Sequence, residues 1–127
     1  MATAMLAAAQ SPGGYGTGLK LWIRADSAAT LGVTAGLIDS WTYANDNTKT
    51  FTATGTERPA LTANSINFLP TATFSRFQIM EGPNGVSAPL AAGNPDYCLF
   101  AVWRSTLAPS ASSFQRVWAQ RHLGGAI

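Results

Sequence analysis

Charged side chains are scarce in this sequence. They make up 11% of the 127 residues, whereas about 25% is typical of soluble globular domains. The polar surface must therefore come mainly from threonine, serine, asparagine and glutamine. Hydrophobic residues reach 46%, which is enough for a packed core in a single domain of this length. This balance favours a β-rich secreted or surface protein over a cytosolic helical one.

A concentration of positive charge is also missing. The formal net charge is +2, from eight basic and six acidic residues, and the basic residues are dispersed along the chain. No window combines clustered lysine and arginine with interleaved aromatic residues, as nucleic-acid-binding surfaces do. We therefore expect no nucleic-acid partner.

Cysteine and histidine occur once each. Cys98 alone can form no intramolecular disulfide and no cysteine-based metal cluster, and its apolar neighbours predict a buried, unreactive thiol. His122 follows the last predicted strand, and we expect it on a solvated turn. The Gly-x-Ser-x-Gly turn that presents the serine of many Ser-His-Asp triads is absent.

No stretch is long and apolar enough to span a membrane. The run Met1–Ala9 resembles the end of a secretory signal with a cleavage site at Ala7–Ala9; a short helix or a disordered tail is the alternative. A linker rich in proline and glycine follows. We therefore divide the chain into a signal remnant and linker over 1–18 and one domain over 19–127, and we expect a secreted or cell-surface location.

Short alternating apolar segments run through the rest of the chain. Alternation places successive side chains on opposite faces of a strand. Helical periodicity longer than two turns is absent after the first ten residues. The fold class is therefore all-β and antiparallel, as in a sandwich or barrel. The predicted strands are Leu19–Arg24, Leu37–Trp41, Lys49–Thr54, Ser65–Phe68, Thr71–Ile79, Asp96–Ser105 and Phe114–Gln120.

Turn residues and prolines mark the connections between these strands. Asp26 is the expected cap of a short helical turn, and Asn45–Asn47 has the composition of a turn. Pro70 is expected to separate two strands, with a further turn near Ser75–Arg76. The segment Glu81–Pro95 is predicted as a loop because it holds three prolines and three glycines.

Asp96–Ser105 is the strongest predicted strand. Its continuous run of aromatic, β-branched and other apolar residues is typical of the centre of a sheet. The sequence ends at Ile127, soon after the apolar segment Phe114–Gln120, and an open strand edge there is an aggregation hazard. We therefore expect the domain to include C-terminal strands that are missing from this sequence.

Four segments, taken in order, resemble a known family. They are Gly18–Asp26, Leu37–Trp41, Arg58–Leu61 and Ile66–Phe74. Their order is similar to the N-terminal portion of concanavalin A-like (laminin-G-like) lectin/glucanase domains of secreted bacterial surface proteins. The later segments Tyr97–Arg104 and Val117–Gln120 resemble the two strands that follow in such domains. The resemblance implies an antiparallel jelly-roll β-sandwich. It departs at Trp41–Asn47, where the family's Ser-Gly pair is absent, so no role of that turn is carried over.

Domains of this fold also include glycoside hydrolases, which need two carboxylates across the scissile bond. In the laminarinase-like family both lie on one Glu-x-Asp-x-x-Glu strand, and this sequence has no such motif. No two of its acids lie closer than seven positions apart. We therefore predict no catalytic residues, with a hydrolase whose carboxylates lie in a missing part as an alternative. The acids are Asp26, Asp39, Asp46, Glu57, Glu81 and Asp96.

Calcium would need several oxygen ligands from loops. The two oxygen-rich loops are Asn45–Asn47 and Asn94–Asp96. Both contain ordinary turn formers that need no metal. We therefore expect no cofactor and no metal site, with calcium as the alternative.

Sugar recognition combines aromatic faces with hydrogen-bonding groups. We expect Trp22, Trp103 and Trp118 to pack in the core or on the second face of the sheet. Trp41 is a further aromatic candidate. Tyr43 is expected to be exposed because it lies beside a polar turn. The candidate ligand-binding residues are Tyr43, Asn45 and Asp46.

Together these features favour a non-catalytic extracellular recognition or adhesion module. Its expected partners are glycans or cell-surface proteins. A glycoside hydrolase of the same fold is one alternative. A structural domain of a phage or of a surface polymer is the other.

Overall fold

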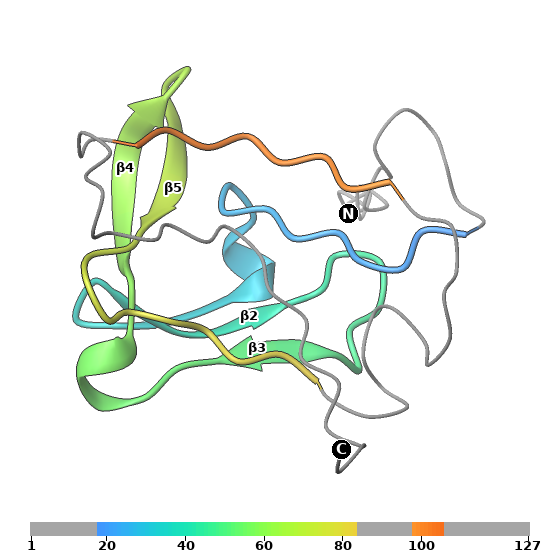
Figure 1. Cartoon of the computed structure of the whole chain (residues 1–127), viewed down its shortest axis with the longest axis horizontal. Coiled ribbons are helices and arrows are strands. Elements are labelled where there is room, and N and C mark those ends of the chain that lie inside the picture. Colours follow the sequence, from blue (N-terminus) through green and yellow to red (C-terminus); the bar gives the residue numbers. More distant parts are fainter. Residues whose placement is uncertain (1–17, 84–97, 106–127) are drawn as a thin grey trace, which may run out of the picture.

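The computed structural model describes residues 18–83 and 98–105. In these residues the chain forms one antiparallel sheet of five strands, with order β1-β2-β4-β5 and with β3 also paired to β2. Within the described residues, helix is limited to two short 3₁₀ turns, η2 (Ala28–Thr30) and η3 (Gly55–Glu57). Figure 1 shows the arrangement. The prediction of an antiparallel all-β fold is therefore confirmed for the part of the chain that the structure describes. The strands are β1 (Leu31–Thr34), β2 (Leu37–Thr42), β3 (Thr50–Thr52), β4 (Ala60–Ile66) and β5 (Leu69–Thr73).

β2 is the centre of the sheet, and its position agrees with the predicted strand Leu37–Trp41. It pairs with β1 along one edge. Along the other edge it pairs first with β4, through Leu37 and Ala60, and then with β3, through Trp41 and Phe51. The two-residue turn between β1 and β2 has positive φ at Ala35 (52°) and Gly36 (79°). This is the turn whose twist matches that of antiparallel strands.

The hairpin of β4 and β5 is joined by a turn at Asn67 and Phe68, with Ile66 paired to Leu69. The predicted strands Ser65–Phe68 and Thr71–Ile79 overlap β4 and β5 only in part, and the break expected at Pro70 is wrong. Pro70 lies inside β5, which is at the end of the strand order. Proline is tolerated there because an edge strand needs no inter-strand bond from every backbone nitrogen.

Three aromatic side chains form a hydrophobic cluster on one face of the sheet. Trp41, Tyr43 and Phe51 are the buried members. They meet on one face because residues two apart on a strand point the same way and because Trp41 is paired with Phe51. Partly buried side chains pack around them, from Leu21, Ile23, Ala25, Leu31, Ala72 and Met80.

The predicted strand Leu19–Arg24 is not a strand in the structure. Its alternation is nevertheless informative, because Leu21 and Ile23 both pack against the aromatic cluster. The backbone N–H of Ala44 donates to the Trp22 carbonyl at 2.7 Å. The Trp22 N–H, however, donates to the Asn45 side chain. A side-chain amide therefore replaces the backbone partner that a regular strand would need.

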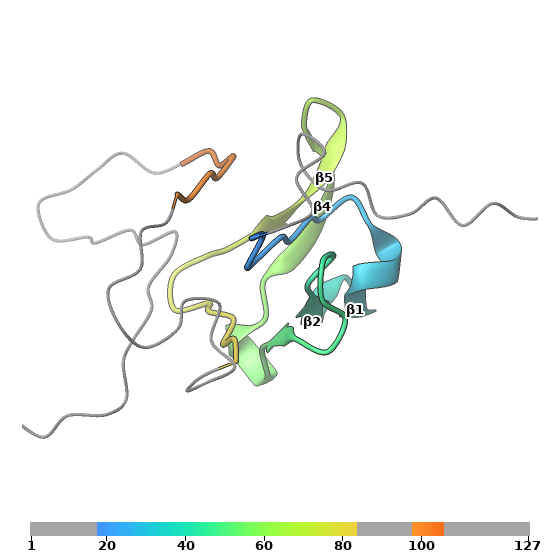
Figure 2. The same cartoon turned by 90° about the vertical axis from the view of Figure 1, so that its right-hand side faces the viewer.

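The prediction of a central strand at Asp96–Ser105 is wrong over its described part. Residues 98–105 belong to no strand, and Figure 2 shows this segment set apart from the β4–β5 hairpin. Phe100 and Val102 are 92% and 87% exposed. Cys98, predicted to be buried, is exposed. Strand propensity alone does not supply a neighbouring strand, and packing against neighbours is what β-propensity largely reflects.

The remaining local predictions have mixed outcomes. A short helical turn does follow Asp26, but its cap residue is Ser27, and no side chain caps it. The turns near Asn45–Asn47 and Ser75–Arg76 are present. Glu81, predicted as the start of a loop, forms an isolated bridge with Thr52 of β3. Several predictions lie outside the described residues, namely those for Met1–Ala9, the linker before Gly18, most of Glu81–Pro95, Asn94–Asp96, Phe114–Gln120, Trp118 and His122.

Candidate functional site

Tyr43 was predicted to be an exposed ligand contact, and this prediction is wrong. Only 1% of the residue is exposed. Its ring stacks on Phe51 with the ring centroids 5.2 Å apart and the planes inclined by 30°. Tyr43 continues the alternation of β2 by one step, which places it on the same face as Trp41. The alternation of β2, and not the polar turn that follows it, determines that Tyr43 is buried. This alternation was the signal in the sequence that could have predicted the burial.

The hydroxyl group of Tyr43 is buried with its ring. It has no hydrogen-bond partner among the described residues. Burial raises the pKa of Tyr43 above its usual value, and the negative charge of Asp46 raises this pKa further. The phenol therefore stays protonated at neutral pH, inside the core and out of reach of a ligand.

Asn45 links the polar turn to the segment before η2. Its side-chain oxygen accepts the N–H of Trp22 at 2.8 Å, and its side-chain nitrogen donates to the Leu19 carbonyl at 3.0 Å. Both ends of the amide are thus used to hold residues 19–22 against the sheet. The structure gives Asn45 an architectural role rather than a free hydrogen-bonding group.

Asp46 shapes the turn itself. Its Oδ1 accepts the backbone N–H of Thr48 at 3.1 Å and the Thr48 hydroxyl at 2.6 Å, and its Oδ2 lies 3.3 Å from the Lys49 ammonium. The bonds from Thr48, with help from Lys49, lower the pKa of this carboxyl. The polar side chains of Asn45 and Asp46 are thus both engaged within the chain.

Asp26 and Asp39 are also held by basic side chains. Asp26 forms a two-pronged pair with Arg24, in which Nε and Nη2 each lie 2.8 Å from a carboxylate oxygen. Asp39 on β2 lies 2.7 Å from Nη1 of Arg58. The pKa of Asp26 is lowered mainly by Arg24. The pKa of Asp39 is lowered by the Thr34 hydroxyl and then by Arg58.

These carboxylates have the wrong electrostatics for a general acid. A glycosidase acid needs a raised pKa so that it carries a proton at working pH, whereas Asp26, Asp39 and Asp46 are all shifted the other way. Within residues 18–83 and 98–105, no three or more acidic, histidine or cysteine side chains are grouped to hold a metal ion. In the same residues no helix is long and apolar enough to cross a membrane.

A different group of residues has the chemistry of a recognition site. The Arg24 guanidinium lies over the ring of Trp22, 5.7 Å from its centroid, and Asp26 holds that guanidinium in place. Trp22 is half-buried, and the side chains of Arg24 and Asp26 are 35% and 27% exposed. We call these three residues the Trp22 patch. The alternation that turns Leu21 and Ile23 inward was the sequence signal, because it turns Trp22 and Arg24 the other way.

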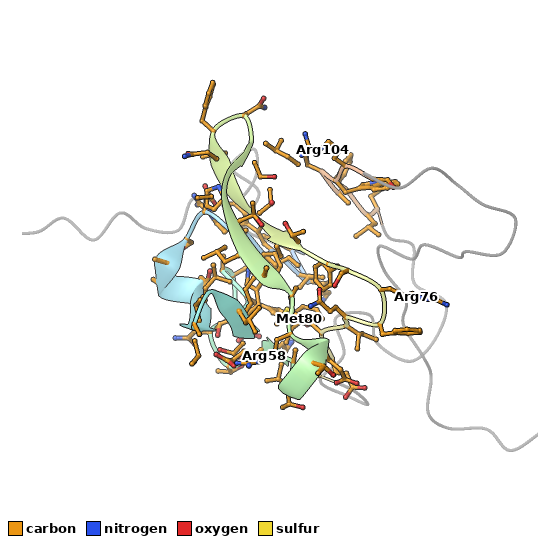
Figure 3. The ribbon with its side chains drawn as sticks, turned by 90° about the vertical axis from the view of Figure 1, so that its left-hand side faces the viewer. Arg58, Arg76, Met80 and Arg104 are labelled. Carbon is orange, nitrogen blue, oxygen red and sulfur yellow. The ribbon has the colours of Figure 1, made fainter. Side chains whose placement is uncertain are left out.

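Other aromatic side chains, which are not members of the Trp22 patch, are also exposed. Trp103, predicted to pack in the core or on the second face, is 58% exposed, and Phe77 is 81% exposed. The Arg76 guanidinium lies 4.7 Å from the centroid of the Phe77 ring. Figure 3 shows Arg76 pointing away from the sheet, on the connection that follows β5. Single exposed apolar side chains of this kind are normal at protein surfaces and do not by themselves indicate a binding site.

Comparison with protein-family models, curated proteins and solved structures finds no match to this chain.

Proposed function

We propose that this protein is a non-catalytic recognition module, secreted or on the cell surface, and that it binds carbohydrate. In this proposal the antiparallel sheet is part of a concanavalin A-like jelly-roll sandwich. The sequence resemblance and the antiparallel all-β fold support that architecture. The chemistry of the exposed side chains supports the role in binding.

The Trp22 patch is the observation that carries the proposal. An indole face stacks on the apolar face of a sugar ring, and charged groups beside it bond to the hydroxyls. Arg24 uses Nε and Nη2 to bind Asp26, which leaves Nη1 without an acceptor among the described residues. The two-pronged pair fixes the guanidinium over one face of the ring, which leaves the other face for a sugar, and little side-chain entropy is lost when a ligand binds.

The charge state of the acids argues for binding without hydrolysis. The three described aspartates are paired with Arg24, Arg58 and Lys49. Their lowered pKa values keep them ionised at neutral pH. Ionised carboxylates accept hydrogen bonds from sugar hydroxyls well, but they do not protonate a leaving group.

A glycan array probed with the full chain tests the proposal. We expect binding to at least one oligosaccharide, and Trp22→Ala should weaken that binding by about tenfold or more, because the stacking face is lost. Trp103→Ala is the matched control, since it removes an exposed indole outside the patch and should leave the affinity unchanged. The proposal is wrong if the full chain binds no glycan, or if the two variants weaken binding equally.

A structural role in a phage or a surface polymer is the second candidate. It is favoured by the exposed apolar side chains of the segment 98–105, above all Phe100 and Val102, because such groups are commonly covered by another protein. This candidate predicts no binding to any glycan on the array, together with self-association at micromolar concentration in sedimentation experiments.

A further inference from the structure

The turn between β4 and β5 has a left-handed backbone at both of its residues, which suits asparagine better than phenylalanine. The two turn residues, Asn67 and Phe68, both have positive φ, 48° and 63°, and the flanking residues Ile66 and Leu69 are paired. This type of two-residue turn strongly favours glycine at its second position. Asparagine tolerates a left-handed backbone, but phenylalanine does so only with strain.

Burial does not compensate for this strain. Phe68 is 89% exposed, so its ring gains little from packing within the protein. Figures 1 and 2 show the tip of this hairpin projecting beyond the rest of the described chain. A strained residue that packs against nothing is a reason to look for a function of its side chain.

The hairpin that carries Phe68 contains polar residues but no charged ones. Asn67 precedes it in the turn, and Asn64, at φ 51°, lies in the irregular stretch of β4 between Thr62 and Ile66. The whole hairpin, from Ala60 to Thr73, contains no charged residue. An exposed ring beside carboxamides can stack on a sugar and bond to its hydroxyls, without attracting or repelling a charged ligand.

We infer that the Asn67–Phe68 turn is a binding site for neutral carbohydrate. This inference rests on the proposed function, but it concerns an element separate from the Trp22 patch. A single projecting ring offers the contact area of one sugar ring, whereas a specific protein interface buries roughly 1,000 Å² or more. An anionic membrane would call for lysine and arginine, which the hairpin lacks.

The experiment is saturation-transfer NMR on the full chain with neutral trisaccharides of glucose, galactose, mannose and xylose. Phe68→Gly is the decisive variant, because it removes the ring and relieves the strain together. In the Trp22→Ala background, where only the turn can bind, we expect Phe68→Gly to weaken the remaining binding by about tenfold. In the parent chain it should raise the melting temperature by about 3 °C. Phe68→Tyr keeps a stacking face and should bind like the parent. Affinity should not change with added salt, because no charge takes part.

Several results would overturn the inference. Unchanged binding by Phe68→Gly would do so, and if Trp22→Ala still abolished binding, the proposed function would stand without the turn. If the chain bound charged sugars but no neutral ones, the inference would also be overturned, and the proposed function would stand. A lower melting temperature for Phe68→Gly would remove the strain argument. Ring-dependent binding to phosphatidylcholine vesicles without sugar binding would assign the turn to a lipid surface. Binding to no sugar at all would reject the inference and the proposed function together.

Discussion

Tyr43 shows how one side chain can pack well and still carry an energetic cost. Its ring stacks on Phe51, but its hydroxyl is buried without a partner among the described residues. A buried hydroxyl without a hydrogen bond loses the water that it bonded to in the unfolded chain. The ring therefore stabilises the folded chain, while the buried hydroxyl lowers the free energy of unfolding.

Replacing that hydroxyl tests this division. Tyr43→Phe keeps the stacked ring and removes the oxygen, so we expect the free energy of unfolding to rise by about 1 kcal/mol. Phe51→Leu, which removes the stacking partner, should lower it by about 1–2 kcal/mol. Urea unfolding followed by tryptophan fluorescence measures both. A loss of stability in Tyr43→Phe would mean that the hydroxyl has a hydrogen bond.

Asn45 belongs to the architecture in the same way. Asn45→Ala removes the bonds to Trp22 and Leu19, and we expect it to lower the free energy of unfolding by about 1–2 kcal/mol. Asn47→Ala changes an exposed amide of the same turn and is the control. Urea unfolding compares the two variants. Equal stability of both would contradict the role assigned to Asn45.

At the scale of the element, turns decide where the strands pair. β1 and β2 are joined by Ala35 and Gly36, both with positive φ. Glycine adopts this backbone without strain, whereas alanine does not. Gly36 therefore suits the turn and Ala35 does not. We expect substitutions at the two positions to have opposite effects on stability.

Ala35→Asn should stabilise the hairpin, and Gly36→Ala should destabilise it, each by about 1 kcal/mol. Asparagine is favoured at the first position of this turn type, and an added Cβ at Gly36 would meet no neighbouring atom. The second effect therefore reports the backbone alone. Thermal melts by circular dichroism measure both shifts. Two shifts of the same sign would show that the turn has another conformation.

The elements also show what the sequence could predict. The strand Leu37–Trp41 was predicted because alternation in a half-buried strand is a local property. For Leu19–Arg24, the inward direction of Leu21 and Ile23 could be predicted, but the strand itself could not, because Asn45 replaces a backbone partner. Burial of Tyr43 depends on β2 extending its face beyond Trp41. The exposure of the segment 98–105 depends on which neighbours it has, and composition does not contain that information.

At the scale of the whole molecule, acid should destabilise the fold. Asp26, Asp39 and Asp46 have lower pKa values in the folded chain than in the unfolded one, where about 3.9 applies. Their contribution to stability is therefore complete above about pH 5 and is lost as the pH falls through the folded values. The cause is the loss of bonds that only the ionised carboxylates accept.

We expect the melting temperature to be constant from about pH 7 to pH 5 and to fall by a modest amount toward pH 2. Replacing the three aspartates by asparagine should lower the plateau and make the fall shallower. Scanning calorimetry across this range measures both effects. A melting temperature that rises or stays level on acidification would contradict the ionised, paired state of these residues.

The central claim is that the chain binds sugar and leaves it intact. The most direct test is an NMR time course of the full chain with the oligosaccharide that it binds best on the array. Saturation transfer to the sugar protons, with anomeric signals that do not change over many hours, is the predicted result. The appearance of new reducing-end signals, or the absence of any transfer, would contradict the claim.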